Sequence, residues 1–274
     1  MRSLLPLLAV ATLAMAASAS YSDETEKWRE KYQQRLKSPQ GWLAVAGLFW
    51  LHEGPNTIGS DAKSEVVLPA SHPAHVGTIV LKGNTASLKS DGAEQTLVAD
   101  KDPIRLGDLS LALIERDHRY AIRMRDPNAE TRRNFTGSKW FPIREEYRIE
   151  ARWVPYNRPK KIAIATILGY VEQQEAPGYA EFDLHGKKMR LEPIVEEPGT
   201  LFFIFKDQTA KHETYPAGRF LDAADPKDGK VILDFNQARN PPCAFTAFAT
   251  CPLPPKQNVM ATRIEAGELK YGSH

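Results

Sequence analysis

The stretch HVGTIVLKGNTASLKSDGAEQTLVAD (residues 75–100) decides the fold class, because its apolar residues recur with a period close to two. Two turn signals, Gly83-Asn84 and Asp91-Gly92, divide the stretch into segments of strand length. Segments joined by such short turns pair as antiparallel neighbours. The stretch therefore predicts a meander of β-strands.

The same pattern continues on both sides and predicts a compact β-sandwich over residues 41–127. Upstream, GWLAVAGLFWL (residues 41–51) is short, apolar and aromatic, which favours a buried strand or a strand–turn–strand. Downstream, IRLGDLSLALIERDHRYAIRMRDP (residues 104–127) continues the meander. The 20 prolines and 17 glycines of the chain agree with many turns and short strands.

The second half of the chain predicts a further antiparallel β-unit. Residues 128–145 are interpreted as a connector, and residues 146–274 as a barrel or a second sandwich. Apolar segments of strand length recur there, among them TLFFIFKD (residues 200–207) and KVILDFN (residues 230–236). This unit includes the unusual loop NPPCAFTAFATCPLPP (residues 240–255). The predicted fold class is therefore mainly β.

Residues 20–40 predict the one convincing helix of the mature protein. Ser22 is a suitable N-cap, because its hydroxyl can accept a hydrogen bond from the first turn. Trp28, Tyr32 and Leu36 recur at helical spacing and form a stripe that we expect to be buried.

The N-terminus predicts export from the cytoplasm. Arg2 precedes an apolar run from Leu4 to Ala17, and Ala17-Ser18-Ala19 matches the small-residue cleavage pattern of a signal peptide. We interpret residues 1–19 as that signal peptide, which predicts a periplasmic or secreted protein. No later stretch is long and apolar enough for a membrane span.

Composition and motifs exclude several classes of function. Apolar residues make up 42% of the chain and charged residues 26%, as in a soluble globular protein. A net charge of +2 does not favour nucleic acid as a partner. The sequence has no nucleophile elbow, no glycine-rich phosphate loop and no zinc-binding His-Glu-x-x-His motif. We therefore predict no cofactor, no metal and no nucleic-acid partner.

Part of the first half resembles the forkhead-associated sandwich. The order Ile58–Ser60, Val66–Pro69 and His75–Val80 is similar to that family's succession of strands and loops. Ser60 stands where the family has arginine, and His72 stands where it has serine. The resemblance therefore implies a fold, and its phosphothreonine-binding groups are absent.

Most of the mature chain resembles a second family. The segments GWLAVAGLFWL (41–51), FKDQTAKHETYPAGRFL (205–221), LDFNQARNPPCAFTAFATCPLPPKQN (233–258) and IEAGELKY (264–271) are similar to domain-of-unknown-function family 1684 of bacteria and archaea. The resemblance extends over residues 25–271. It implies a shared fold and no particular activity.

The only two cysteines, Cys243 and Cys251, lie in the Pro-rich loop. In an exported protein such a pair favours a disulfide. A reduced structural pair remains open, as do a redox pair and a metal site. The redox interpretation is weakened because the usual spacing is Cys-x-x-Cys, and the metal interpretation because no histidine flanks the pair.

A high density of polar residues around this loop indicates where a site would lie. The ligand-binding candidates are Asp207, Thr209, Tyr215, Arg219, Asn236, Asn240 and Asn258. The catalytic candidates are Asp234 and Glu265, with Arg219 as the holder of an anion. Such side chains are also typical partners of turn backbone.

Two functions follow from these observations. The preferred one is an exported protein that binds a small polar or anionic ligand, or a protein partner. The alternative is a metal-independent hydrolase or lyase of the cell envelope that uses Asp234 or Glu265 with Arg219.

Overall fold

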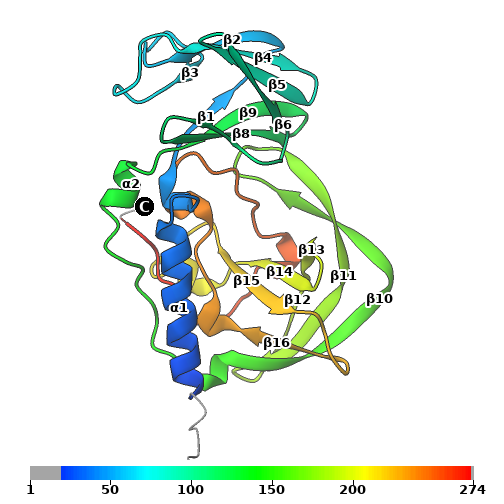
Figure 1. Cartoon of the computed structure of the whole chain (residues 1–274). Helices are drawn as coiled ribbons and strands as arrows, with labels where there is room; N and C mark the ends of the chain where they lie inside the picture. Colours follow the sequence, from blue (N-terminus) through cyan, green and yellow to red (C-terminus); the bar gives the residue numbers. More distant parts are fainter. Residues whose placement is uncertain (1–19, 273–274) are drawn as a thin grey trace, which may run out of the picture.

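The computed structural model describes residues 20–272, and the predicted signal peptide of residues 1–19 lies outside them. The described chain is mainly β-structure with one long helix, as the sequence predicts, and Figure 1 shows it as two stacked β-units. The helices are α1 Tyr21–Lys37 and α2 Glu130–Arg133. The strands are β1 Val45–Trp50, β2 Gly54–Gly59, β3 Val66–Val67, β4 Gly77–Lys82, β5 Thr85–Ser90, β6 Ala93–Val98, β7 Ile104–Leu106, β8 Leu109–Arg116, β9 Arg119–Arg125, β10 Arg148–Ala165, β11 Val171–Leu184, β12 Lys187–Leu191, β13 Ile194–Glu197, β14 Thr200–Phe205, β15 Arg219–Ala224 and β16 Lys230–Asp234.

The N-cap of helix α1 lies two residues earlier than the sequence predicts. Ser20, and not Ser22, is the N-cap, and its hydroxyl accepts a hydrogen bond of 3.2 Å from the backbone N–H of Asp23. The carboxylate of Asp23 accepts the backbone N–H of Ser20 in return, which completes a capping box. This reciprocal pair explains the choice of cap, because the residue three positions after Ser22 is Thr25, which has no carboxylate.

The predicted apolar stripe of α1 faces the rest of the protein. Tyr32 and Leu36 are buried, and the rings of Trp28 and Tyr32 stack with their centroids 5.6 Å apart. Trp140, from the segment between the two units, meets both rings edge-on. The helix is thus fixed by aromatic packing along the side of the lower unit in Figure 1.

The upper unit in Figure 1, which we call the sandwich unit, contains β1 to β9. One sheet has the strand order β1-β9-β8-β7 and the other β3-β2-β4-β5-β6, and their inner faces share one apolar core. Both predicted hairpin turns are present. Gly83 has φ +59° and begins the first, while Asp91 (φ 48°) and Gly92 (φ 75°) form the second, as two-residue hairpin turns require. The resemblance of this unit to the forkhead-associated sandwich stays a prediction.

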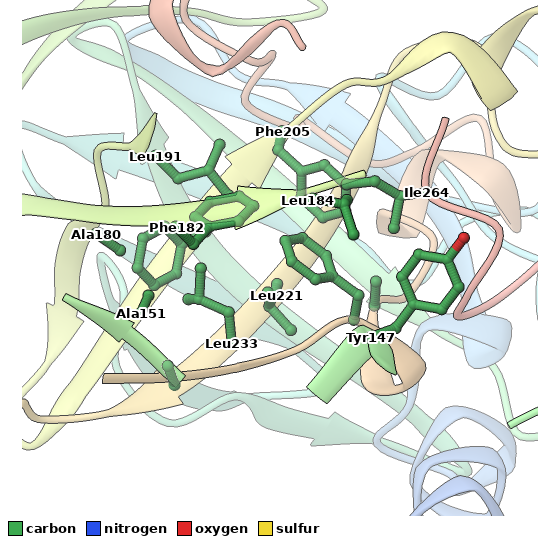
Figure 2. Close-up of a cluster of buried hydrophobic side chains, with 14 of the residues drawn as sticks. Tyr147, Ala151, Ala180, Phe182, Leu184, Leu191, Phe205, Leu221, Leu233 and Ile264 are labelled. Carbon is green, nitrogen blue, oxygen red and sulfur yellow. The ribbon is translucent and has the colours of Figure 1, made fainter. Parts of the chain in front are cut away.

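The lower unit, which we call the half-barrel unit, contains β10 to β16. The long strands β10 and β11 curve around its outside in Figure 1 and belong to a sheet of order β12-β11-β10-β16. A second sheet, β13-β14-β15, packs inside the curve. Figure 2 shows the core between them, where Phe182, Phe205 and Leu233 come from three different strands. This packing buries the inner faces of both sheets.

The Pro-rich loop, residues 240–255, runs between the two units. Thr246 donates a hydrogen bond of 3.1 Å to the carbonyl of Val45 at the start of the sandwich unit. On the other side, the backbone N–H of Leu253 donates to the carbonyl of Ala165 in the half-barrel unit at 2.7 Å. The loop therefore joins the units, and any cavity at their junction borders it.

No helix found between residues 20 and 272 combines the length and apolarity that crossing a membrane would need.

Candidate functional site

A cavity of about 830 Å³ lies where α1, both β-units and the Pro-rich loop meet. Its volume is in the range of sites that hold small molecules. Apolar and aromatic groups make up much of the wall, and several polar groups stand among them. The polar groups that matter most below are Arg116, Arg123, Glu172, Glu196 and Asn240.

Two arginines of the sandwich unit meet the Pro-rich loop at this cavity. Arg116 lies at the end of β8 and Arg123 lies on β9, the next strand of the hairpin. Both guanidinium groups donate to the hydroxyl of Thr250, Arg116 at 3.2 Å and Arg123 at 3.3 Å. Arg123 also stacks over the ring of Trp42, 5.0 Å from its centroid. The Thr250 hydroxyl thus contacts both guanidinium groups at the cavity wall, and the Trp42 ring contacts that of Arg123.

Arg123 is a buried cation without a counter-ion of its own. Arg123 is 6% exposed. No carboxylate of residues 20–272 lies within ion-pair distance of its guanidinium group. Its Nε atom is buried and has no hydrogen-bond partner in that part of the chain. Burial, together with repulsion from Arg116 and Arg125, lowers the pKa of Arg123 to about 10. A buried, unpaired charge is costly, so this arrangement favours a bound anion.

Arg116 needs a bound anion less than Arg123 does, because it already has a counter-ion. Asp100 lies 3.3 Å from its guanidinium group, in a partly exposed ion pair. Arg116 therefore adds positive charge to the cavity, and Arg123 is the stronger candidate for the main contact with an anion.

Carboxylates form another part of the cavity wall. Glu172 lies on β11, and Glu196 lies on β13, an edge strand of the inner sheet. Glu196 is an exposed residue, yet partial burial of its carboxyl raises its pKa, and repulsion from Asp222 acts in the same direction. Nearby Arg239 is engaged with Asp222 in an ion pair of 2.9 Å.

A buried glutamate lies just behind the wall. Glu268 is 0% exposed and accepts hydrogen bonds from the backbone N–H of Asn240 at 2.7 Å and from the hydroxyl of Tyr32 at 3.2 Å. Tyr32 and Asn240 both line the cavity, whereas Glu268 does not. Burial raises the pKa of Glu268 to about 7, although the hydrogen bonds it accepts oppose the shift. The Tyr32 side chain therefore links Glu268 to the wall of the cavity.

The two cysteines lie in contact with each other beside this cavity. The backbone N–H of Cys243 donates to Sγ of Cys251 at 3.2 Å, and Cys251 lines the cavity. The pKa of the Cys243 thiol is lowered, chiefly by its interaction with the Cys251 thiol and to a smaller extent by the nearby Tyr215 hydroxyl. The loop therefore places both sulfur atoms in one small region.

That the cysteines are bonded stays a prediction, and thiol counting tests it. If the predicted signal peptide directs export, the isolated protein, unfolded without reductant, is expected to show no free thiol, because oxidising compartments favour a disulfide between neighbouring cysteines. The same sample after reduction should show two. A Cys243→Ser variant, which should show one thiol under both conditions, serves as a control. Two reactive thiols in the unreduced wild type would contradict the disulfide.

The predicted residue Arg219 lies away from this cavity, inside the half-barrel unit. It is 1% exposed and forms a buried ion pair of 3.1 Å with Asp207. It also donates to the backbone carbonyls of Ile264 and Ala266. Thr209 donates to Asp207 at 2.9 Å and the backbone N–H of Ile264 donates to it at 2.6 Å, so three residues hold that carboxylate. Arg219 and Asp207 thereby fasten the C-terminal segment to the core.

The predicted catalytic carboxylates are also held by neighbouring groups. Asp234 accepts a hydrogen bond of 2.7 Å from the hydroxyl of Tyr21 on α1. Glu265 forms ion pairs with Arg144 at 3.3 Å and with Arg263 at 3.0 Å. Within the described residues no hydrogen bond or ion pair joins either carboxylate to Arg219. A role for them in a reaction stays a prediction.

The remaining predicted ligand-binding residues have different surroundings. Asn236 donates to the carbonyl of Arg144, and Asn258 donates to the carbonyls of Glu192 and Ile204, so both bond backbone. Tyr215 donates to the carbonyl of Cys243. Of the predicted set, Asn240 lines the cavity.

The sequence-based predictions did not include Arg116 and Arg123, the two arginines of the sandwich unit that line the cavity. Arg123 lies in the apolar strand pattern YAIRM, where alternation places it on a buried face. An arginine at a buried strand position was a usable signal, since a buried charge needs a partner or a ligand. What the pattern cannot supply is the position of Thr250 and Trp42, which come from distant parts of the chain.

Comparison with known proteins identifies the family and no activity. The family model described as "Protein of unknown function (DUF1684)" matches residues 133–269, half of the chain. A solution NMR structure of an uncharacterised protein of Haloarcula marismortui is 31% identical and has a TM-score of 0.42; the match covers 50% of this chain and 78% of that one. No curated protein matches. The predicted family resemblance is therefore confirmed over residues 133–269, and the chain belongs to the DUF1684 family.

Proposed function

We propose that this protein binds a small anionic molecule in the cavity between its two β-units, with Arg123 as the main anchor. The observation that carries the proposal is the buried Arg123 guanidinium, which lines a cavity of about 830 Å³ without a carboxylate partner among the described residues. A carboxylate or phosphate group on a ligand would supply the missing counter-ion to this guanidinium.

The surroundings of Arg123 support recognition of a specific anion. Thr250 and the ring of Trp42 hold the guanidinium in one place, so little side-chain entropy remains to be lost on binding. Arg116 adds a second positive charge at the same hydroxyl. The apolar part of the wall would contact the rest of the ligand.

The predicted signal peptide adds a proposed location. If residues 1–19 direct export, the ligand is a molecule of the periplasm or the surroundings of the cell. The envelope-enzyme alternative receives less support from the geometry, since Arg219, its predicted anion holder, is already bound to Asp207 and two carbonyls.

A thermal-shift screen of small carboxylates and phosphate esters tests the proposal. At least one compound is expected to raise the melting temperature of the wild type, because a ligand that binds the native state stabilises it by mass action, by about 2.7 kcal/mol at 100 times the Kd. Arg123→Gln is expected to abolish that shift.

The matched control is Arg119→Gln, on the same strand, where the guanidinium stacks over Trp50 and does not line the cavity. It should keep the ligand-induced shift. The proposal fails if Arg123→Gln responds to the same compound as strongly as the wild type, or if no compound of either class stabilises the wild type.

A further inference from the structure

A second orphan polar atom belongs to a residue that lines the same cavity. Asn240 is 2% exposed, and its Oδ1 atom is buried without a hydrogen-bond partner in the described part of the chain. The amide orientation is fixed, because Nδ2 donates to the carbonyl of Leu269 at 2.8 Å. Oδ1 is thus an acceptor on a cavity-lining residue, and leaving such a group unpaired is costly. A ligand that satisfies it must carry an N–H or O–H donor.

The charges next to Asn240 favour a cationic donor. Arg239, the preceding residue, is fully engaged with Asp222, through contacts of 2.9 and 3.1 Å. Glu196 forms no ion pair or hydrogen bond with any described residue. Burial and the negative charges of Asp222, Glu197 and Glu172 raise its pKa, and the positive charge of Arg239 opposes that shift. Apart from Arg116 and Arg123, the cavity is lined by two arginines, Arg35 and Arg239, and by four carboxylates, Glu172, Glu196, Glu197 and Asp222. Outside the Arg116–Arg123 part of the wall the carboxylates therefore outnumber the cations.

The positive and negative parts of the wall do not neutralise each other. No ion pair among residues 20–272 joins Arg116 or Arg123 to Glu172 or Glu196, although all four line one cavity. The positive part comes from the sandwich unit, and the negative part from the edge of the half-barrel unit. Two of the lining residues also carry buried polar atoms without a partner among the described residues: the donor Nε of Arg123 and the acceptor Oδ1 of Asn240.

We infer that the ligand is a zwitterion with well-separated charges, whose acidic group contacts Arg123 and Arg116 and whose amine faces Asn240, Glu196 and Glu172. The inference rests on the proposed function and adds the second, cationic end of the ligand. Amino acids with a distal amine, ω-amino acids and short peptides have this chemistry, and the cavity has room for any of them.

Matched probes that differ in one charge test the inference on the full mature chain. Calorimetric titrations compare γ-aminobutyrate with butyrate, and ε-aminocaproate with caproate. In the pair whose length fits, the amino acid is expected to bind about tenfold or more tightly than the plain acid, because a charge-assisted hydrogen bond is added.

Variants then assign each end. Glu196→Gln and Glu172→Gln are expected to reduce the advantage of the amino acid and to leave the affinity for the plain acid unchanged. Arg123→Gln should abolish binding of both. Glu175→Gln is the control, since Glu175 lies on β11 with Glu172 but does not line the cavity. Melting temperatures of all variants verify that each one is folded.

The outcomes separate this inference from the proposed function. If the plain acids bind as tightly as the amino acids, or if the advantage survives both glutamate substitutions, the zwitterion inference is wrong and the anion site stands. If neither series binds to the wild type, both the inference and carboxylate binding at Arg123 are overturned.

Discussion

Arg219→Ala is expected to lower the free energy of unfolding by about 3–5 kcal/mol, because it leaves a buried carboxylate without its cation. Arg219 and Asp207 are 1% and 4% exposed, and the ion pair between them measures 3.1 Å. The substitution also removes the donors that satisfy the carbonyls of Ile264 and Ala266. Asp207 would keep its bonds to Thr209 and to the backbone N–H of Ile264, which do not neutralise its charge.

Urea unfolding of the purified variant measures this loss. Arg152→Ala is the control: Arg152 pairs with Glu181 at 2.7 Å on the surface, where solvent screens the interaction, so its loss should change the stability little. The double variant Arg219→Met/Asp207→Leu removes both charges and should recover part of the loss. A cost of less than about 1 kcal/mol for Arg219→Ala would show that the pair does not secure the C-terminal segment.

Glu268→Gln is expected to stabilise the protein at about pH 8 and to have much less effect at about pH 5. The folded pKa of Glu268 is about 7, against an ordinary value of 4.5, because burial disfavours its charged form. Between these values the folded state binds more protons than the unfolded state, so stability falls as the pH rises. Above the folded pKa the accumulated cost is about 3 kcal/mol, which glutamine avoids because it does not ionise.

The gain at high pH should be smaller than that cost, because glutamine cannot reproduce every hydrogen bond that Glu268 accepts from Asn240 and Tyr32. Glu265→Gln gives the opposite sign. The Arg263 and Arg144 guanidinium groups lower the pKa of Glu265, so its charge stabilises the fold above its ordinary pKa. Urea unfolding at both pH values measures each difference. An equal effect of Glu268→Gln at the two pH values would contradict the assigned pKa.

The secondary structure of this protein was largely predictable because its determinants are local. The turns at Gly83 and Asp91-Gly92 use positive φ angles that those residue types tolerate, so short-range sequence specifies the meander. The stripe of α1 depends only on helical periodicity. The N-cap was misplaced because Ser20 and Ser22 are chemically equivalent, and the reciprocal bond from Asp23 decides between them.

The cavity was not predictable in the same way, because its groups are distant in sequence. Arg123 and Thr250 are separated by 127 positions and meet only when the Pro-rich loop lies against β9. The polar residues around that loop were visible in the sequence, but their partners were not. Asn258 and Asn236 turn out to bond backbone carbonyls, which local sequence cannot distinguish from binding a ligand.

The placement of the Pro-rich loop between the units has a mechanical consequence. The loop is covalently continuous with the half-barrel unit. It is hydrogen-bonded to the sandwich unit through Thr246 and Thr250. A ligand that bridges the arginines of one unit and the carboxylates of the other would act as a tether across the same junction. Its binding should make the two units unfold as a single cooperative block, with a steeper denaturant transition than the ligand-free protein shows.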